Sequence, residues 1–170
     1  MGADVFVADE QSALQVDVER WAELARSVLD AEGVGDDVEV SLLFVDEPAI
    51  AELNERFLGN SGPTDVLAFP IDDEAVPGGR SPDEGGTGPG GPLSSEEEPV
   101  PMLLGDVVVC PTVARRHAEE RERSVEDEMA LLVVHGLLHL LGMDHADSDE
   151  AERMERREQQ LLSRFWRSTG

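Results

Sequence analysis

The chain has 170 residues, of which 40% are hydrophobic and 30% charged, a balance typical of one globular domain large enough to bury a core. Its formal net charge of −25 excludes a general electrostatic attraction to nucleic acid, so any nucleic-acid function must depend on a local site. The single cysteine, Cys110, excludes an internal disulfide. Since no apolar run reaches the ~20 residues of a membrane span and no signal-peptide pattern opens the chain, we expect a cytoplasmic protein.

In the first half of the chain, β-rich segments alternate with segments of helical periodicity. Leu14, Val18 and Trp21 begin a series of apolar residues at three- and four-residue spacing, which predicts an amphipathic helix ended by Gly33. Pro48 lies near the start of a shorter helix. We expect strands at residues 4–8, 38–45 and 65–69, and helices at residues 12–31 and about 47–57.

Residues 72–101 differ in composition from the rest of the chain. They contain many glycines, prolines and acidic residues but little apolar material to offset the entropy of ordering. This composition predicts a disordered acidic insertion between two strands, within a single domain that spans residues 1–170. A tolerated insertion is the simpler interpretation, and an acidic lid or partner-binding arm is the alternative.

The second half of the chain is mainly helical. Ser124 begins a capping-box-like start to an apolar central helix, and Gly142 follows as its C-terminal glycine. We expect a strand at residues 103–109 and helices at residues 111–122, 125–141 and 148–166. The predicted fold class is α+β (α/β): a single domain with a small four-stranded mixed sheet, about five helices and a metal cleft at the end of the central helix.

Three histidines in this central segment form a candidate metal site. His135 and His139 are four residues apart, so that they share one helical face, and His145 follows the helix-ending Gly142. One histidine in an apolar helix is usually a core residue, but three in this pattern favour metal binding, because each buried ring needs a partner. Three imidazole ligands would leave one position on zinc for water, as in catalytic sites.

The histidine spacing is that of the metzincin proteases, but the chemistry differs. Those proteases place glutamate directly after the first histidine, where it serves as the general base. Here that position is Gly136, so a peptidase would need a carboxylate from elsewhere in the chain. The sequence therefore argues against a protease.

Three segments carry a resemblance to a known family. They are Pro63-Thr-Asp-Val-Leu-Ala-Phe-Pro70, Leu104-Gly-Asp-Val107, and Val134-His-Gly-Leu-Leu-His-Leu-Leu-Gly-Met-Asp-His145 followed by Met154. With these motifs the chain resembles the YbeY family of ribosomal RNA maturation nucleases. The resemblance implies a zinc-dependent, single-strand-specific endoribonuclease, with one Zn²⁺ per chain held by the three histidines. It further implies maturation of the 3′ end of 16S rRNA, ribosome quality control, and the small ribosomal subunit and its proteins as partners.

The chain departs from the family near the turn before residues 65–69. Many relatives carry an arginine just before the glycine of that turn, and it is thought to assist the chemistry. Here Leu58 precedes Gly59, and Arg56 lies two residues away on a helix, where it points elsewhere. This departure, together with the net charge, favours the alternative function: a non-catalytic ribosome-assembly factor with a structural metal site.

Several further residues are candidates for the predicted site. A metal-bound water would be the catalytic group, and Asp144 is a candidate base or partner for a ligand histidine. Thr64, Asp65 and Arg56 are candidates for substrate binding, because they lie near the expected sheet edge. The attacking group can be this water or the RNA 2′-hydroxyl, and the sequence leaves both open.

Polar residues outside these motifs have simpler interpretations. We expect Cys110 to be buried in the core and His117 to be a solvated helix residue. The arginine-rich stretch around it predicts ion pairs within one helix or, alternatively, a phosphate-contact surface; it comprises Arg115, Arg116, Arg121 and Arg123.

Overall fold

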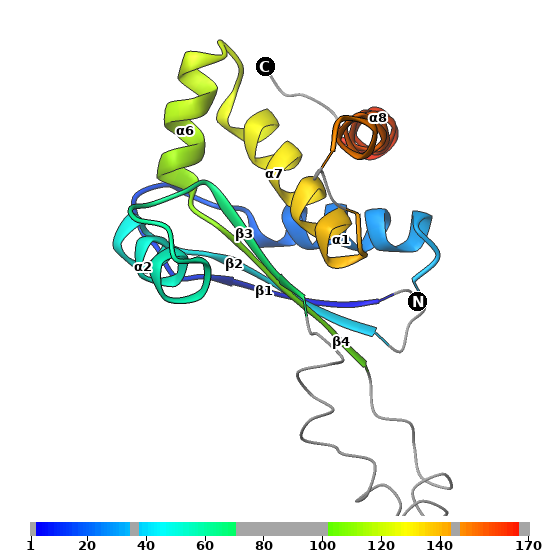
Figure 1. The fold of residues 1–170 in the computed structure, drawn as a ribbon, viewed down its shortest axis with the longest axis horizontal. Coiled ribbons are helices and arrows are strands. Elements are labelled where there is room, and N and C mark those ends of the chain that lie inside the picture. Colours follow the sequence, from blue (N-terminus) through cyan, green and yellow to red (C-terminus); the bar gives the residue numbers. More distant parts are fainter. Residues whose placement is uncertain (1–2, 35–37, 71–101, 144–146, 167–170) are drawn as a thin grey trace, which may run out of the picture.

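The computed structural model describes residues 3–34, 38–70, 102–143 and 147–166 (Figure 1). Its four strands form one sheet in the order β1-β2-β4-β3. The strands are β1 (Asp4–Asp9), β2 (Val38–Phe44), β3 (Val66–Pro70) and β4 (Met102–Val109). Strands β1, β2 and β4 are parallel, and β3 pairs antiparallel with β4, so the predicted mixed sheet is confirmed.

Five α-helices and one π-helical turn accompany the sheet in the described part of the chain. They are α1 (Val18–Ala31), α2 (Glu47–Leu53), η1 (Asn54–Leu58), α6 (Pro111–Glu120), α7 (Val125–Leu140) and α8 (Ser148–Phe165). The α+β class is therefore confirmed. None of the helices in these residues is both long enough and apolar enough to cross a membrane. The predicted insertion at residues 72–101 lies outside the described residues.

The two faces of the sheet carry different helices. Val107 and Val109 of β4 belong to the main core, which α1 and α7 also line, whereas Val108 between them belongs to a smaller core. That smaller core includes Ile50 of α2. Because side chains alternate along a strand, α1 and α7 cover one face and α2 lies on the other, as Figure 1 shows. The central helix α7 thus packs against the neighbouring strands β3 and β4.

The ends of the helices follow from local side-chain contacts. The Ser124 hydroxyl accepts a hydrogen bond from Asp127 N at 3.0 Å, so the predicted cap of α7 is confirmed. The predicted helix from residue 12 begins later, at Val18. There the side chain of Gln11 bonds the backbone N–H and C=O of Leu14, which holds this segment in a loop, and Asp17 caps the helix.

Candidate metal centre

His135 and His139 lie next to each other in the last turns of α7. Their ring centroids are 5.5 Å apart, and the ring planes meet at 65°. The i, i+4 spacing on a regular helix produces this arrangement, because such residues lie one above the other on one face. The sequence prediction that these two rings share a helical face is thus confirmed.

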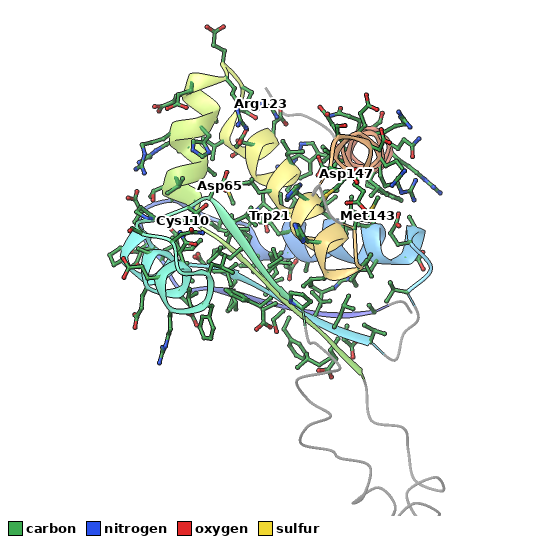
Figure 2. The ribbon with its side chains drawn as sticks, viewed as in Figure 1. Trp21, Asp65, Cys110, Arg123, Met143 and Asp147 are labelled. Atoms are coloured by element: carbon green, nitrogen blue, oxygen red, sulfur yellow. The ribbon has the colours of Figure 1, made fainter. Side chains whose placement is uncertain are left out.

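Gly142 ends α7 in the manner expected from the sequence. Its φ of +100° lies in the left-handed region that favours glycine. Its N–H donates to His139 O at 3.0 Å, and Met143 N donates to Leu138 O at 3.0 Å, which is the Schellman arrangement of a helix C-terminus. Figure 2 marks Met143 and Asp147, which flank the short link from α7 to α8. Asp144 and His145 lie in that link, outside the described residues, so the third ligand stays a prediction.

A carboxylate on α8 completes the surroundings of His135. Glu158 Oε2 lies 2.5 Å from His135 Nδ1, and the Glu158 side chain is only 8% exposed. Sequence reasoning missed Glu158. A signal was present, however, because Glu158 occupies an inward position of α8 between the buried residues Met154 and Leu161. An acidic residue in an otherwise apolar stripe needs a polar partner, and His135 is that partner.

A cavity of about 370 Å³ opens beside the two histidines. Its walls come from two parts of the chain, the segment around β3 and the end of α7. The lining residues are Leu58, Asp65, Val66, Leu67, Ala68, His135, Gly136 and His139. The expected cleft at the end of the central helix is therefore present, and it is shared with the edge strand of the sheet.

Gly136 allows α7 to approach the sheet closely at this point. A Cβ atom on Gly136 would lie 2.6 Å from Cγ1 of Val107 on β4, a distance that real side chains do not tolerate. The absence of a side chain therefore brings the histidine pair close to the sheet edge. The close contact with Val107 also explains why position 136 is a glycine here, whereas the metzincin proteases have a glutamate at the corresponding place.

Of the predicted substrate-binding residues Thr64, Asp65 and Arg56, only Asp65 is among the described residues that line the cavity. Asp65 lies in the wall of the cavity, and Thr64 Oγ1 is 3.5 Å from Asp65 Oδ1. Arg56 is 66% exposed, lies 3.9 Å from Glu52, and is not among the residues that line the cavity. Leu58 does line it, so the departure from the family pattern falls directly beside the histidine pair.

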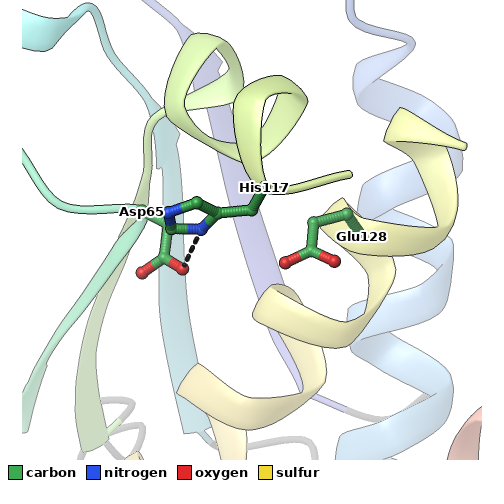
Figure 3. A group of neighbouring side chains, drawn as sticks. All are labelled: Asp65, His117 and Glu128. Atoms are coloured by element: carbon green, nitrogen blue, oxygen red, sulfur yellow. Dashed lines mark hydrogen bonds and ion pairs between the residues drawn. The ribbon is translucent and has the colours of Figure 1, made fainter. Parts of the chain in front are cut away.

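A second polar group adjoins this cavity. Ligand atoms of Asp65, His117 and Glu128 lie within 4.8 Å of one another, so these three side chains could together hold a metal ion. Figure 3 shows the His117 ring beside the Asp65 carboxylate, with Glu128 reaching toward them from α7. His117 Nδ1 is 3.1 Å from Asp65 Oδ2 and its side chain is 33% exposed, so the expectation of a solvated helix residue is wrong.

The arginines of this region pair between elements rather than within α6. Arg121 Nη1 lies 2.7 Å, and Arg123 Nε 3.5 Å, from the carboxylate of the fully buried Glu128 on α7. Arg116 lies 2.7 Å from Glu47 at the start of α2. The expectation of intrahelical pairs is therefore wrong for these three residues. Periodicity along one helix could not reveal partners supplied by neighbouring helices.

Glu47 is the carboxylate whose titration these contacts change. The Arg116 guanidinium and the Thr112 hydroxyl both donate to it and hold its pKa below the ordinary value of 4.5. In return, the carboxylate raises the pKa of Arg116. This pair ties α2 to α6. The expected packing role of Cys110 nearby is confirmed, since it is fully buried.

Comparisons of the sequence and of the structure relate the chain to known proteins. A sequence model described as Endoribonuclease YbeY matches residues 6–166. Proteins of that name from Frankia casuarinae and Thermobifida fusca are 46% and 44% identical to the chain. They cover 94% and 96% of it, and 73% and 95% of their own lengths are matched. A solution structure of a Thermotoga maritima protein aligns with a TM-score of 0.54 and 25% identity, over 94% of this chain and 89% of that one. The chain therefore belongs to the YbeY family of endoribonucleases.

Proposed function

We propose that this protein is a zinc-dependent endoribonuclease that cuts single-stranded RNA, with His135, His139 and His145 as the metal ligands. The observation that carries the proposal is the pair of imidazoles in one cavity wall, together with the buried Glu158 carboxylate that contacts Nδ1 of His135. The relatives named as endoribonucleases supply the substrate class.

The donor set fits a zinc ion. Imidazole nitrogen is a common zinc ligand, and histidines that bind zinc almost always give their other ring N–H to a carboxylate, carbonyl or water. If His135 Nδ1 donates to Glu158, its neutral ring presents Nε2 for coordination. When bound, the metal would supply Lewis acidity toward a phosphoryl oxygen and lower the pKa of water.

The chain's own residues have separate roles in this proposal. Asp65 stands in the cavity wall, where its carboxylate can accept a hydrogen bond from the RNA or from the attacking hydroxyl. The Thr64 hydroxyl lies 3.5 Å from the Asp65 carboxylate, and Arg56 stays a candidate for contacts with more distant phosphates. Asp144 stays a candidate partner of a ligand histidine. Because the overall charge is −25, RNA must be held by such local contacts.

The proposed biological setting is the cytoplasm and the ribosome. The resemblance described above implies that the substrate is the 3′ end of immature 16S rRNA on the small subunit, with a further role in ribosome quality control. DNA and membranes are not expected partners. The rival function, a non-catalytic assembly factor with a structural metal, is favoured by the net charge of −25 and by the presence of Leu58 at the cavity.

Metal analysis and an RNA cleavage assay on the same preparation test the proposal. Protein purified without chelator should contain about one zinc per chain, cut single-stranded RNA, and leave a duplex of the same sequence intact. His139→Ala should abolish both zinc binding and cleavage, whereas Asp30→Ala, at an exposed site on α1, should change neither. Zinc-loaded protein that binds small subunits but cuts no RNA would establish the rival function instead.

The chemistry of the product ends identifies the nucleophile. Attack by water with departure of the 3′-oxygen leaves a 5′-phosphate on the downstream fragment and a 3′-hydroxyl on the upstream one. Attack by the RNA 2′-hydroxyl expels the 5′-oxygen and leaves a 2′,3′-cyclic phosphate on the upstream fragment. We expect 5′-phosphate ends. A cyclic phosphate would exclude hydrolytic attack while retaining the endoribonuclease assignment.

A further inference from the structure

Asp65 is held in the cavity wall from two sides. Its backbone C=O accepts a hydrogen bond from Cys110 N at 2.9 Å, which fixes the chain at the entry to β3. Its carboxylate oxygen Oδ2 lies 3.1 Å from His117 Nδ1 on α6. The backbone contact fixes where Asp65 stands, and the side-chain contact fixes where its carboxylate points.

The face of α7 that carries His135 and His139 also carries Glu128, which lies near Asp65 and His117. Glu128, His135 and His139 are separated by seven and then four residues, a spacing that places them along one side of a helix. Asp65 adjoins both ends of this line, since it lies near Glu128 and lines the cavity with the two histidines. The group that includes His117 is therefore continuous with the candidate metal centre.

The charges around Glu128 favour a protein-only interaction here over a second metal ion. The Glu128 carboxylate is fully buried and faces two guanidiniums, those of Arg121 at 2.7 Å and Arg123 at 3.5 Å. A divalent cation bound by Glu128 would be repelled by both arginines or would have to displace them. Glu128 is thus paired with two arginines, although its Oε1 accepts no hydrogen bond among the described residues, and the hydrogen bond within the group joins His117 and Asp65.

We propose that His117 is a positioning residue for RNA cleavage, whose Nδ1–H donates to Asp65 Oδ2 and orients the Asp65 carboxylate into the histidine cavity. The inference rests on the proposed function for its kinetic consequence. Glu128 on α7 has a carboxylate oxygen within 4.8 Å of a His117 ring nitrogen, and it accepts a hydrogen bond from Arg121 at the end of α6. His117 itself touches neither RNA nor metal in this arrangement.

Substitutions that keep or remove the donor at Nδ1 test the proposal. The side-chain amide nitrogen of asparagine occupies nearly the place of Nδ1, whereas that of glutamine falls nearer Nε2. His117→Leu and His117→Gln should lower kcat by about tenfold or more, the size seen when partners of site residues are removed, with KM nearly unchanged. His117→Asn should recover most of kcat. The proposal would be overturned if all three variants kept the kcat of the unaltered chain, or if all three lost the same fraction of it, at unchanged thermal stability.

A double-substitution cycle separates positioning from a general structural role. If His117 acts through Asp65, His117→Leu should have no further effect on the activity of Asp65→Ala. A similar fold loss in both backgrounds would refute the mechanism. Metal content provides the other decisive outcome, because loss of one bound metal per chain from His117→Leu would make the group a metal site.

A measurement that needs no activity keeps this inference separate from the proposed function. Long-range ¹H–¹⁵N spectra should show a proton on His117 Nδ1, and Asp65→Ala should shift that nitrogen. An unprotonated Nδ1 cannot donate to a carboxylate and would exclude the proposal. Failure of the proposed function would appear differently, as absence of RNA cleavage by the unaltered chain.

Discussion

Glu158 on α8 forms a hydrogen bond with Nδ1 of His135 on α7, a contact between helices that are joined by the short link carrying His145. The contact orients the His135 ring, and because a carboxylate accepts hydrogen bonds it favours the tautomer with the proton on Nδ1. Both effects matter for metal binding, since an unoriented ring loses conformational entropy when it coordinates. The helix pair α7–α8 therefore supports the site as well as the fold.

Glu158→Gln should weaken zinc binding by about 10- to 100-fold while the protein remains folded, because the amide accepts a hydrogen bond less strongly than a carboxylate. Competition with a fluorescent zinc chelator measures the change in affinity. Glu152→Gln, at an exposed position on the same helix, removes the same charge and serves as the control. Equal zinc affinities for the two variants would show that Glu158 does not support the metal.

Leu58→Arg should raise RNA cleavage by about threefold or more. Leu58 lines the histidine cavity, so an arginine there would place a guanidinium where a phosphate must come, and bidentate pairing of arginine with phosphate is strong. Steady-state kinetics with a single-stranded oligonucleotide measure the effect. Leu58→Gln controls for the loss of the apolar side chain. If arginine and glutamine have the same effect, the position does not contact phosphate.

Gly136→Ala should destabilise the protein by about 1–3 kcal/mol, because its Cβ would overlap with Val107 across the interface of α7 and β4. Urea unfolding followed by circular dichroism gives the free energy of unfolding. Val107→Ala removes the overlapping Cγ atom, so the double variant should be more stable than the two separate losses predict. Strict additivity would show that the two residues do not compete for the same space.

Glu47 should make stability depend on pH in the acidic range. Its folded-state pKa is lowered, so the pair with Arg116 stabilises the protein above the unfolded pKa, and this contribution is lost as the pH falls through the folded pKa. The pair is partly exposed, so we expect less than about 1 kcal/mol. Thermal melts between about pH 3 and 7 should show a shallower decline for Glu47→Gln than for the unaltered chain. Parallel declines would contradict the assignment.

Features encoded by neighbouring residues could be predicted from the sequence. The cap at Ser124, the glycine at 142 and the apolar periodicity between them define α7 within one residue, and the shared face of His135 and His139 follows from helix geometry. Likewise, the alternation of strands and helices indicates the fold class. These predictions succeed because each depends on contacts within a few residues of chain.

Contacts between distant segments could not be predicted in the same way. The pairing of Glu158 with His135 and of His117 with Asp65 depends on how α8 and β3 pack against α6 and α7, which no local pattern specifies. The order of the strands also depends on long-range pairing, with β4 inserted between β2 and β3. Buried polar residues in apolar stripes, such as Glu128 and Glu158, were the available signals.

The tight seam between α7 and β4 also limits how this scaffold could be adapted to another reaction. The metzincin proteases place their general base at the position of Gly136, but Val107 already fills the space that a glutamate side chain there would enter. Acquiring protease chemistry at this position would thus require the helix to move off the sheet, with loss of the packing between α7 and β4 that places the histidine pair at the sheet edge. A single substitution of Gly136 by glutamate would therefore lower the stability of the fold whatever activity it added.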